Sequence, residues 1–171
     1  MIMNLEAINN CKNEHLLPVL KKLKAYEKYC NLLSGDLGTY VKTHDYVGNM
    51  PSQLKEWLKL FDGGVLFTTS MFSTKAKEEG RFNRILTFAE INSPDFKREN
   101  GIPQDIVCFA MTNYGNYYCY VSSENSECLY EWDAEQNALT VKWNDFAEWL
   151  DEQIEFAESL INDDLLEPLE V

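Results

Sequence analysis

Basic residues are almost missing from the last fifty positions of this chain. Between Ser122 and Val171, Lys142 is the one base, against 15 Asp and Glu. The first 121 residues hold the other 14 bases and 13 acids, so the net charge is +1 there and −14 in the last fifty, which gives −13 in total. A surface of that sign repels nucleic acid and anionic lipid and attracts cationic proteins. We therefore expect either a protein partner or a solubilising face, and no nucleic-acid partner.

Long apolar runs, linkers and paired cysteines are absent as well. No stretch approaches the ~20 apolar residues of a membrane span, and Met1 to Glu14 has no apolar run of signal-peptide length. No segment rich in Pro, Ser and Gly divides the 171 residues, which predicts a single domain over 1–171. The five cysteines are scattered without a CxxC pair, a pattern typical of reduced, buried thiols. We expect a cytoplasmic protein that contacts no membrane.

Motifs for catalysis and cofactor binding are missing too. The chain has no GxSxG, GxxxxGK[ST] or GxGxxG segment and no calcium loop of the DxDxDG kind. His15 and His44 are far apart in sequence, and two histidines do not complete a zinc site without carboxylates placed by the fold. Three cysteines on successive expected strands would form a metal or redox site, or would simply fill a buried sheet: Cys108, Cys119 and Cys128. We expect no catalytic residue, no cofactor and no metal.

The first third of the chain predicts two helices. Apolar residues recur through Leu16–Leu33 at helical spacing, and an irregular connection follows over Gly35–Asn49. Pro51 suits a first helical position, because the N–H that proline lacks would be unpaired there anyway. The segment Asp62-Gly63-Gly64 is expected to end this second helix, since glycine accepts the left-handed conformation that closes a helix.

The middle of the chain changes to a strand-like period. A polar stretch, Ser73–Gly80, is expected to form an exposed loop between the first two strands. The expected strands are Val65–Ser70, Arg84–Phe88, Ile106–Thr112, Tyr117–Val121, Cys128–Asp133 and Leu139–Lys142. The connections after residue 106 are short, which forces neighbouring strands to run antiparallel. The pattern predicts a β-meander.

The last predicted element is an amphipathic helix. Asp145, with Glu148 three residues later, predicts a capping box at its start. Its apolar stripe consists of Phe146, Trp149, Leu150, Ile154, Ala157 and Ile161. The opposite face carries Asp151, Glu152, Glu155 and Glu158. Like charges at this spacing cost a few tenths of a kcal/mol each, which favours a cationic partner over a merely solvated face.

Five short segments in this order resemble the SUKH superfamily, which contains the yeast cell-wall regulator of the Smi/Knr type and many bacterial immunity proteins. The segments are Met50-Pro51 with Trp57-Leu58, Asp62-Gly63-Gly64, Ile102–Val107 before the turn at Gly115, Tyr130–Asp133, and Asn144–Leu150. The resemblance covers about 49–150. It leaves 1–48 as a helical N-terminal extension and 162–171 as an acidic tail.

The resemblance implies an α+β fold, in which an antiparallel sheet has N-terminal helices and the C-terminal helix packed beside it, and no enzymatic activity. Most bacterial members are similar to immunity proteins that neutralise a cognate toxin in the cytoplasm by stoichiometric occlusion. A basic toxin, such as a nuclease, would complement the acidic surface. The predicted partner contacts are then Glu127, Glu131, Asp133, Glu135, Asp151, Glu152, Glu155 and Glu158.

Two alternative functions stay open at this point. A regulatory or scaffold protein of the Smi/Knr type would share the fold and bind a cellular protein. An enzyme would have to build its site from residues that no motif marks. Five aromatic residues follow the buried stripes and are expected in the core instead of the interface: Trp57, Phe61, Trp132, Phe146 and Trp149.

Overall fold

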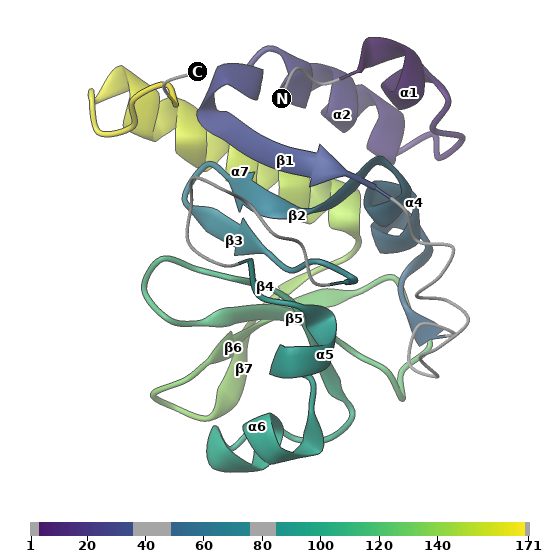
Figure 1. Cartoon of the computed structure of the whole chain (residues 1–171), viewed down its shortest axis with the longest axis vertical. Coiled ribbons are helices and arrows are strands. Elements are labelled where there is room, and N and C mark those ends of the chain that lie inside the picture. The colour runs from purple at the N-terminus through teal and green to yellow at the C-terminus, as the bar shows by residue number, and fades with distance from the viewer. Residues whose placement is uncertain (1–3, 36–48, 76–84, 170–171) are drawn as a thin grey trace.

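One twisted antiparallel sheet forms the centre of the molecule. The computed structural model describes residues 4–35, 49–75 and 85–169. Within these ranges, the strands pair in chain order as a seven-stranded sheet (Figure 1). They are β1 (Cys30–Ser34), β2 (Phe61–Leu66), β3 (Thr69–Met71), β4 (Ile106–Met111), β5 (Tyr117–Val121), β6 (Leu129–Asp133) and β7 (Ala138–Trp143). Every neighbouring pair is antiparallel, so the predicted α+β meander is confirmed.

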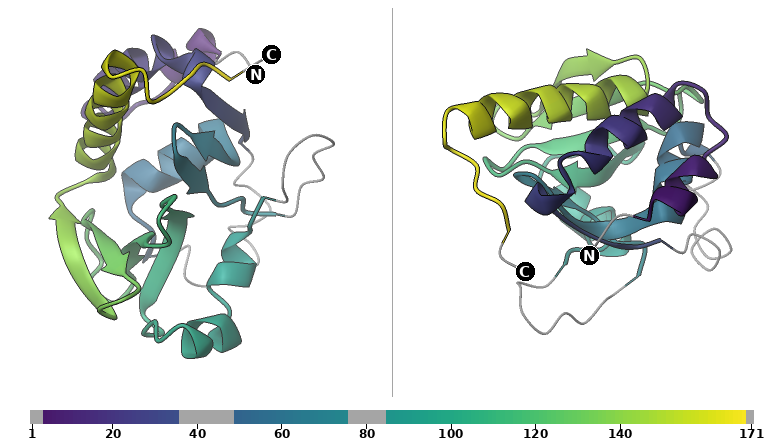
Figure 2. Two further views of the ribbon diagram at one scale, coloured as in Figure 1. Left: turned by 90° about the vertical axis from the view of Figure 1, so that its left-hand side faces the viewer. Right: turned by 90° about the horizontal axis from the view of Figure 1, so that it is seen from above.

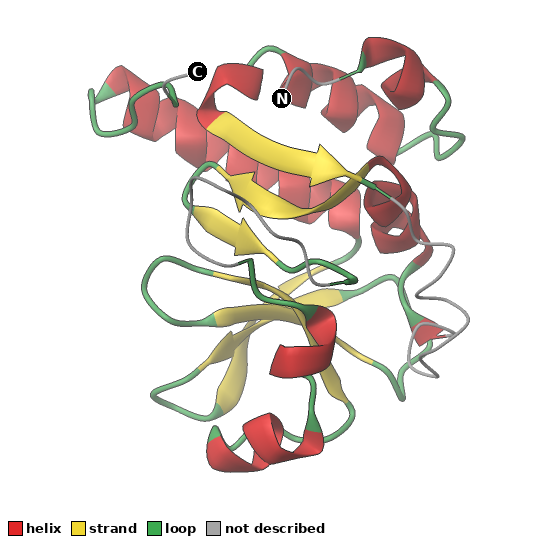
Figure 3. Cartoon of the chain, in the orientation of Figure 1, coloured by secondary structure: helices red, strands yellow, loops and turns green. Residues whose placement is uncertain are grey.

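Helices lie on both sides of this sheet (Figures 2 and 3). They are α1 (Leu5–Asn9), α2 (Leu16–Lys24), the 3-10 turn η1 (Glu27–Tyr29), α4 (Ser52–Leu60), α5 (Phe88–Ile91), α6 (Pro94–Glu99) and α7 (Phe146–Asn162). Helix α7 contacts α2, α4 and β7, whereas α5 contacts β4. Figure 2 shows α7 and α5 on opposite sides of the sheet.

The C-terminal helix begins as predicted, with one change in its cap. The Asp145 side chain accepts from the Glu148 backbone N–H at 2.8 Å. The Glu148 carboxylate accepts from the N–H of Asn144 at 2.6 Å, one residue earlier than a capping box requires. The predicted stripe is buried from Phe146 to Ala157, and Ile161 is partly buried against the same core.

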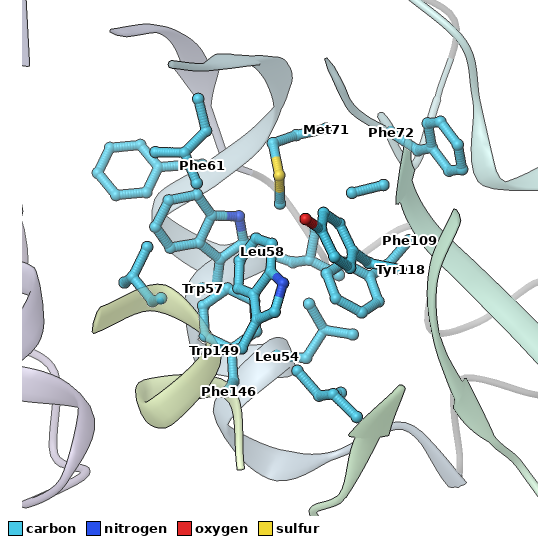
Figure 4. Close-up of a cluster of buried hydrophobic side chains, with 14 of the residues drawn as sticks. Leu54, Trp57, Leu58, Phe61, Met71, Phe72, Phe109, Tyr118, Phe146 and Trp149 are labelled. Carbon is cyan, nitrogen blue, oxygen red and sulfur yellow. The ribbon is translucent and has the colours of Figure 1, made fainter. Parts of the chain in front are cut away.

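Aromatic side chains from α4, α7 and the sheet meet in one core cluster (Figure 4). Trp57 is fully buried, with ring centroids 4.7 Å from Phe61 and 5.3 Å from Phe146. Trp149 lies 5.3 Å from Phe109 of β4. Such tilted and edge-on pairs stabilise the core beyond their buried area. All five aromatics predicted for the core are buried.

The prediction of one N-terminal helix over Leu16–Leu33 was wrong beyond Lys24. Cys30–Ser34 is a strand, β1, paired with β2 at the edge of the sheet. Its alternating burial is hidden in the sequence, because the same apolar residues also fit a helical spacing. The segment 1–48, expected to be helical, therefore contributes a strand to the sheet.

Two glycines expected to end the second helix belong to a strand instead. Helix α4 ends at Leu60, and β2 runs through Gly63 and Gly64. Gly64 has φ +114°, and a Cβ there would lie 2.1 Å from the carbonyl oxygen of Asn31 in β1. Glycine is required because the backbone of β1 approaches this position closely. The start of this helix also differs by one residue from the prediction, because Pro51 is the N-cap and α4 begins at Ser52.

The prediction of one strand over Val65–Ser70 was wrong, because this segment is a hairpin. The chain reverses at Phe67, which has φ +55°, and this turn joins β2 to β3. The expected strand Arg84–Phe88 is also wrong in its described part. There, Thr87 forms an isolated bridge with Ser73 and then caps α5 through a capping box with Glu90. Residues 36–48 and 76–84 lie outside the described ranges, and with them His44 and most of the two expected connections.

The first residues of the expected loop Ser73–Gly80 are buried rather than exposed. Thr74 donates from its backbone N–H and its hydroxyl to the buried Asp62 carboxylate, at 2.6 and 2.7 Å. Burying a carboxylate requires such donors, since an unpaired one would cost several kcal/mol. This loop start is therefore part of the core.

Candidate functional site

The predicted partner contacts do not form one surface. Glu127 is half-buried and accepts from the backbone N–H of Ser52 at 2.9 Å and of Gln53 at 3.4 Å, so that it caps the start of α4. An acceptor in this place satisfies helix N–H groups that have no partner within the helix. Glu127 therefore has a structural role in the fold.

Asp133 and Glu135 lie at the turn between β6 and β7. The Asp133 side chain accepts from the backbone N–H groups of Glu135 and Gln136, both at 2.9 Å. This arrangement is an Asx turn, which fixes the reversal of the chain. The side chain of Glu135 is exposed beside it.

The acidic face of α7 is partly neutralised by α2. Asp151 pairs with the Lys22 ammonium at 2.7 Å. The hydrogen bond that Lys22 donates to Asp151 raises the pKa of Lys22 against its partial desolvation, and the charges of Glu155 and Glu158 contribute to the same rise. Since Lys22 lies among these three carboxylates, this edge of α7 carries less net charge than the sequence suggests. Glu155 and Glu158 remain exposed.

Two of the predicted residues, Glu131 and Glu152, line one pocket. We call this pocket the α7 cleft; its volume is about 200 Å³. Its lining comes from the β2–β3 turn, β3, the β4–β5 turn, β5, β6, β7 and α7: Thr68, Thr69, Thr112, Asn113, Tyr114, Tyr118, Glu131, Val141, Trp143, Glu152, Gln153 and Phe156. The meander brings these residues together, because β5, β6 and β7 are neighbours and α7 follows β7 directly.

Neutral donors hold both carboxylates in place. One oxygen of Glu131, Oε1, accepts from the Tyr114 hydroxyl at 3.0 Å and from the Asn116 side-chain amide at 2.8 Å. Burial raises the pKa of Tyr114, and the hydrogen bond to Glu131 raises it further. The hydroxyl of Tyr114 therefore stays protonated and remains a donor to Glu131.

On the other side of the α7 cleft, Glu152 accepts from the indole N–H of Trp143. The Trp143 ring packs edge-on against Tyr118, with centroids 5.7 Å apart. By contrast, the indole N–H groups of Trp57, Trp132 and Trp149 are buried without an acceptor among the described residues. Trp143 thus differs from the core tryptophans, because it fixes a carboxylate at the surface.

Apolar side chains line the same cleft and are exposed. Tyr114 is 66% exposed, Phe156 55% and Val141 40%. Exposed aromatic residues beside a pocket are typical of the few residues that dominate binding at protein interfaces. Sequence reasoning missed them. The available signal was Phe156, an aromatic residue outside the apolar stripe of α7 and among its acidic residues.

The cysteine alternative is only partly supported. Cys108 and Cys119 are direct partners across β4 and β5, and both are fully buried, but Cys128 precedes β6 and has no place in that pair. Burial raises the pKa of Cys108 to about 12 and that of Cys119 well above its usual value, so both stay neutral thiols. Among the described residues, no three His, Cys, Asp or Glu side chains gather as a metal site would require.

Two other titratable groups lie away from the cleft. His15 is exposed and lies 3.8 Å from the Asp145 carboxylate. Lys97 is buried, donates to the Gln104 carbonyl at 2.9 Å, and has its pKa lowered by burial. In the described parts of the chain, no helix is both long and apolar enough to cross a membrane.

Comparison with known proteins gives one result. The family model for the SMI1/KNR4 family (SUKH-1) matches residues 47–152, which is more than half of the chain. The matched region contains α4, the strands from β2 to β7 and the first part of α7. No curated protein matches the chain significantly.

Proposed function

We propose that this chain, which belongs to the SMI1/KNR4 family (SUKH-1), is an immunity protein that binds a cognate toxin in the cytoplasm and neutralises it by occlusion. Family membership supports a role in protein binding. The choice of an immunity role follows from the resemblance to bacterial immunity proteins. The single observation that carries the binding site is the α7 cleft, where two fixed carboxylates lie among exposed aromatic side chains.

The charge distribution supports a basic partner. The last fifty residues carry a net charge of −14, and they form β6, β7 and α7, which supply half of the lining of the α7 cleft. A field of this sign raises the rate at which a cationic protein finds the surface. A nuclease toxin would have a positive surface of this kind, because its own surface must attract nucleic acid.

A regulatory or scaffold protein of the Smi/Knr type is the second candidate function. It would use the same acidic surface on a cellular protein instead of a toxin. An enzyme is the third, and it would need a reacting group in a pocket. The described lining of the α7 cleft contains no histidine, cysteine or lysine, so acid–base chemistry there would depend on Glu131 and Glu152.

The deciding experiment has two steps. The protein is first purified from its native host with whatever it binds, and the partner is identified. The partner's toxic activity is then measured against increasing amounts of this protein. We expect a linear loss of activity that ends at one equivalent, because occlusion is stoichiometric. Loss at far below one equivalent would indicate an enzyme that inactivates its target. Recovery of a cell-envelope protein without toxic activity would indicate the scaffold function.

A further inference from the structure

We propose that the α7 cleft receives an arginine side chain of the partner, with its guanidinium between the carboxylates of Glu131 and Glu152. This inference rests on the proposed function only in assuming that the partner is a protein. It goes further by naming one anchor site and the chemical group that fits it.

The electrostatics of the α7 cleft call for a cation. None of its lining residues is Lys or Arg. Among the described residues, neither Glu131 nor Glu152 forms an ion pair, and the donors that orient them are neutral. In Glu131 both of these donors bind the same oxygen, Oε1, and in Glu152 the Trp143 indole binds Oε2. The second oxygen of each carboxylate is left to accept a charged donor.

The other acidic residues of the surface are engaged differently. Asp151 already pairs with Lys22, while Glu127 and Asp133 accept from backbone N–H groups. The remaining predicted contacts outside the cleft, Glu135, Glu155 and Glu158, are exposed, and Glu158 is also hydrogen-bonded to Tyr26. An ion pair between fully exposed side chains contributes little, because water screens it. In the α7 cleft, by contrast, Glu131 is half-buried, and Glu152, although exposed, is held in place by the indole N–H of Trp143. Two carboxylates that form no ion pair among the described residues thus line one pocket together with aromatic side chains.

Size and lining favour one long side chain. A volume of about 200 Å³ is below the range of about 300–1,000 Å³ that is usual for small-molecule sites. Tyr114, Tyr118, Trp143 and Phe156 supply aromatic rings to the walls. A guanidinium stacks on such rings and donates in a planar fork that matches carboxylates, whereas an ammonium holds its water more strongly. Arginine fits this combination better than lysine.

The test uses a peptide, acetyl-Gly-Arg-Gly-amide, titrated into the isotopically labelled full-length protein and followed by NMR. The indole N–H of Trp143 is the reporter, because it donates to Glu152 inside the cleft. The same peptide with citrulline in place of arginine is the matched control, since it has nearly the same shape without the charge. We expect saturable shifts of the Trp143 indole signal and of Tyr114 and Gln153 with the arginine peptide, and none with the citrulline peptide.

Two double variants remove the same charge from different places. E131Q/E152Q keeps the side-chain oxygens that accept from Tyr114, Asn116 and Trp143, so the fold should persist. E135Q/E155Q removes two exposed carboxylates outside the cleft. We expect the dissociation constant of the arginine peptide to rise at least tenfold in the first variant and less than twofold in the second. The tenfold change corresponds to the greater strength of a charge-assisted hydrogen bond over a neutral one.

The inference is overturned by any of three results: equal shifts with citrulline, equal weakening in both variants, or arginine-induced shifts that avoid the cleft. The outcome is separable from that of the proposed function. Specific binding of the arginine peptide with no toxin recovered from the host would leave the cleft assigned and the immunity role rejected. Recovery of a toxin that binds the wild type and E131Q/E152Q equally well would support the immunity role and reject the assignment of the cleft.

Discussion

The carboxylate of Glu127 caps the first turn of α4 by accepting from the Ser52 N–H at 2.9 Å, although the two residues are 75 positions apart in the chain. Ser52 has no capping side chain in sequence before it, since the N-cap position is Pro51. The loop before β6 thus supplies the acceptor that the local sequence lacks.

Replacing Glu127 by Ala should therefore lower the free energy of unfolding by about 1 kcal/mol, the usual cost of losing a helix cap. Urea denaturation measures this change. The Glu135→Ala control removes an exposed acid of the same charge and should stay within about 0.5 kcal/mol of the wild type. Equal stability of the two variants would mean that this cap contributes nothing.

Trp57 is the second stability prediction. Its ring is fully buried between Phe61 and Phe146, and Trp57→Ala should destabilise the fold by about 3 to 5 kcal/mol. Phe156→Ala is the control, because Phe156 is 55% exposed, and it should cost about 1 kcal/mol or less. Thermal and urea unfolding give both values, and an unchanged midpoint for Trp57→Ala would contradict the core described above.

The buried thiol of Cys108 predicts a loss of stability in alkali. Burial raises its pKa from 9.0 to about 12, so above pH 9 the unfolded chain releases a proton that the folded protein retains. The stabilisation is complete below pH 9 and is lost as the pH rises toward 12. The free energy of unfolding should fall across this window, and Cys108→Ala should reduce its slope. The buried tyrosine Tyr118, whose pKa is also raised by burial, keeps part of the slope in the variant.

A fourth prediction concerns the speed of association with a toxin once it is identified. Glu155 and Glu158 are exposed on α7, and changing both to Lys should lower the association rate of a basic partner while leaving the fold intact. The rate for the wild type should also fall with salt, as the Debye length shrinks from about 10 Å at 0.1 M to about 3 Å at 1 M. Surface plasmon resonance across a salt series measures both effects.

The control for this prediction changes charge elsewhere by the same amount. Asp95 and Glu99 are exposed on α6, which lies at the opposite end of the molecule from α7 in Figure 1. Converting both to Lys should leave the association rate close to that of the wild type. If the two double variants slow association equally, net charge alone matters and α7 has no special part in steering.

Local signals were enough to predict the fold from Ile106 onward, whereas α5 and α6 were not predicted. Each signal there is local in the sequence: the turn with Gly115 at φ +93°, the short connections, and the apolar stripe of α7. The strand β1 was missed because its pairing partner, β2, lies about thirty positions further along, and no local pattern distinguishes its apolar residues from those of a helix. The two glycines of β2 were misread for a similar reason, since Gly64 is required by the approach of β1 and Gly63 by the approach of Ser73.

The proposed binding surface was predictable only in part. Charge placed it in the C-terminal third, and two of the eight predicted acids, Glu131 and Glu152, line the cleft. The roles of Glu127 and Asp151 could not be predicted, because their partners Ser52 and Lys22 come from distant elements. A carboxylate in the sequence does not reveal whether it accepts from backbone, pairs with a lysine or faces solvent.

The position of Gln153 and Phe156 has a consequence for the choice of partner. Both line the α7 cleft, yet both follow the region that the family model matches, which ends at residue 152. Their neighbours Ile154 and Ala157 must stay apolar because they are buried against the core. Gln153 is half-buried and bonded to Thr69 and Tyr118, whereas Phe156 is 55% exposed and free of such ties among the described residues. Under the proposed function, a substitution of Phe156 can therefore change which partner is bound without disturbing the buried stripe of α7.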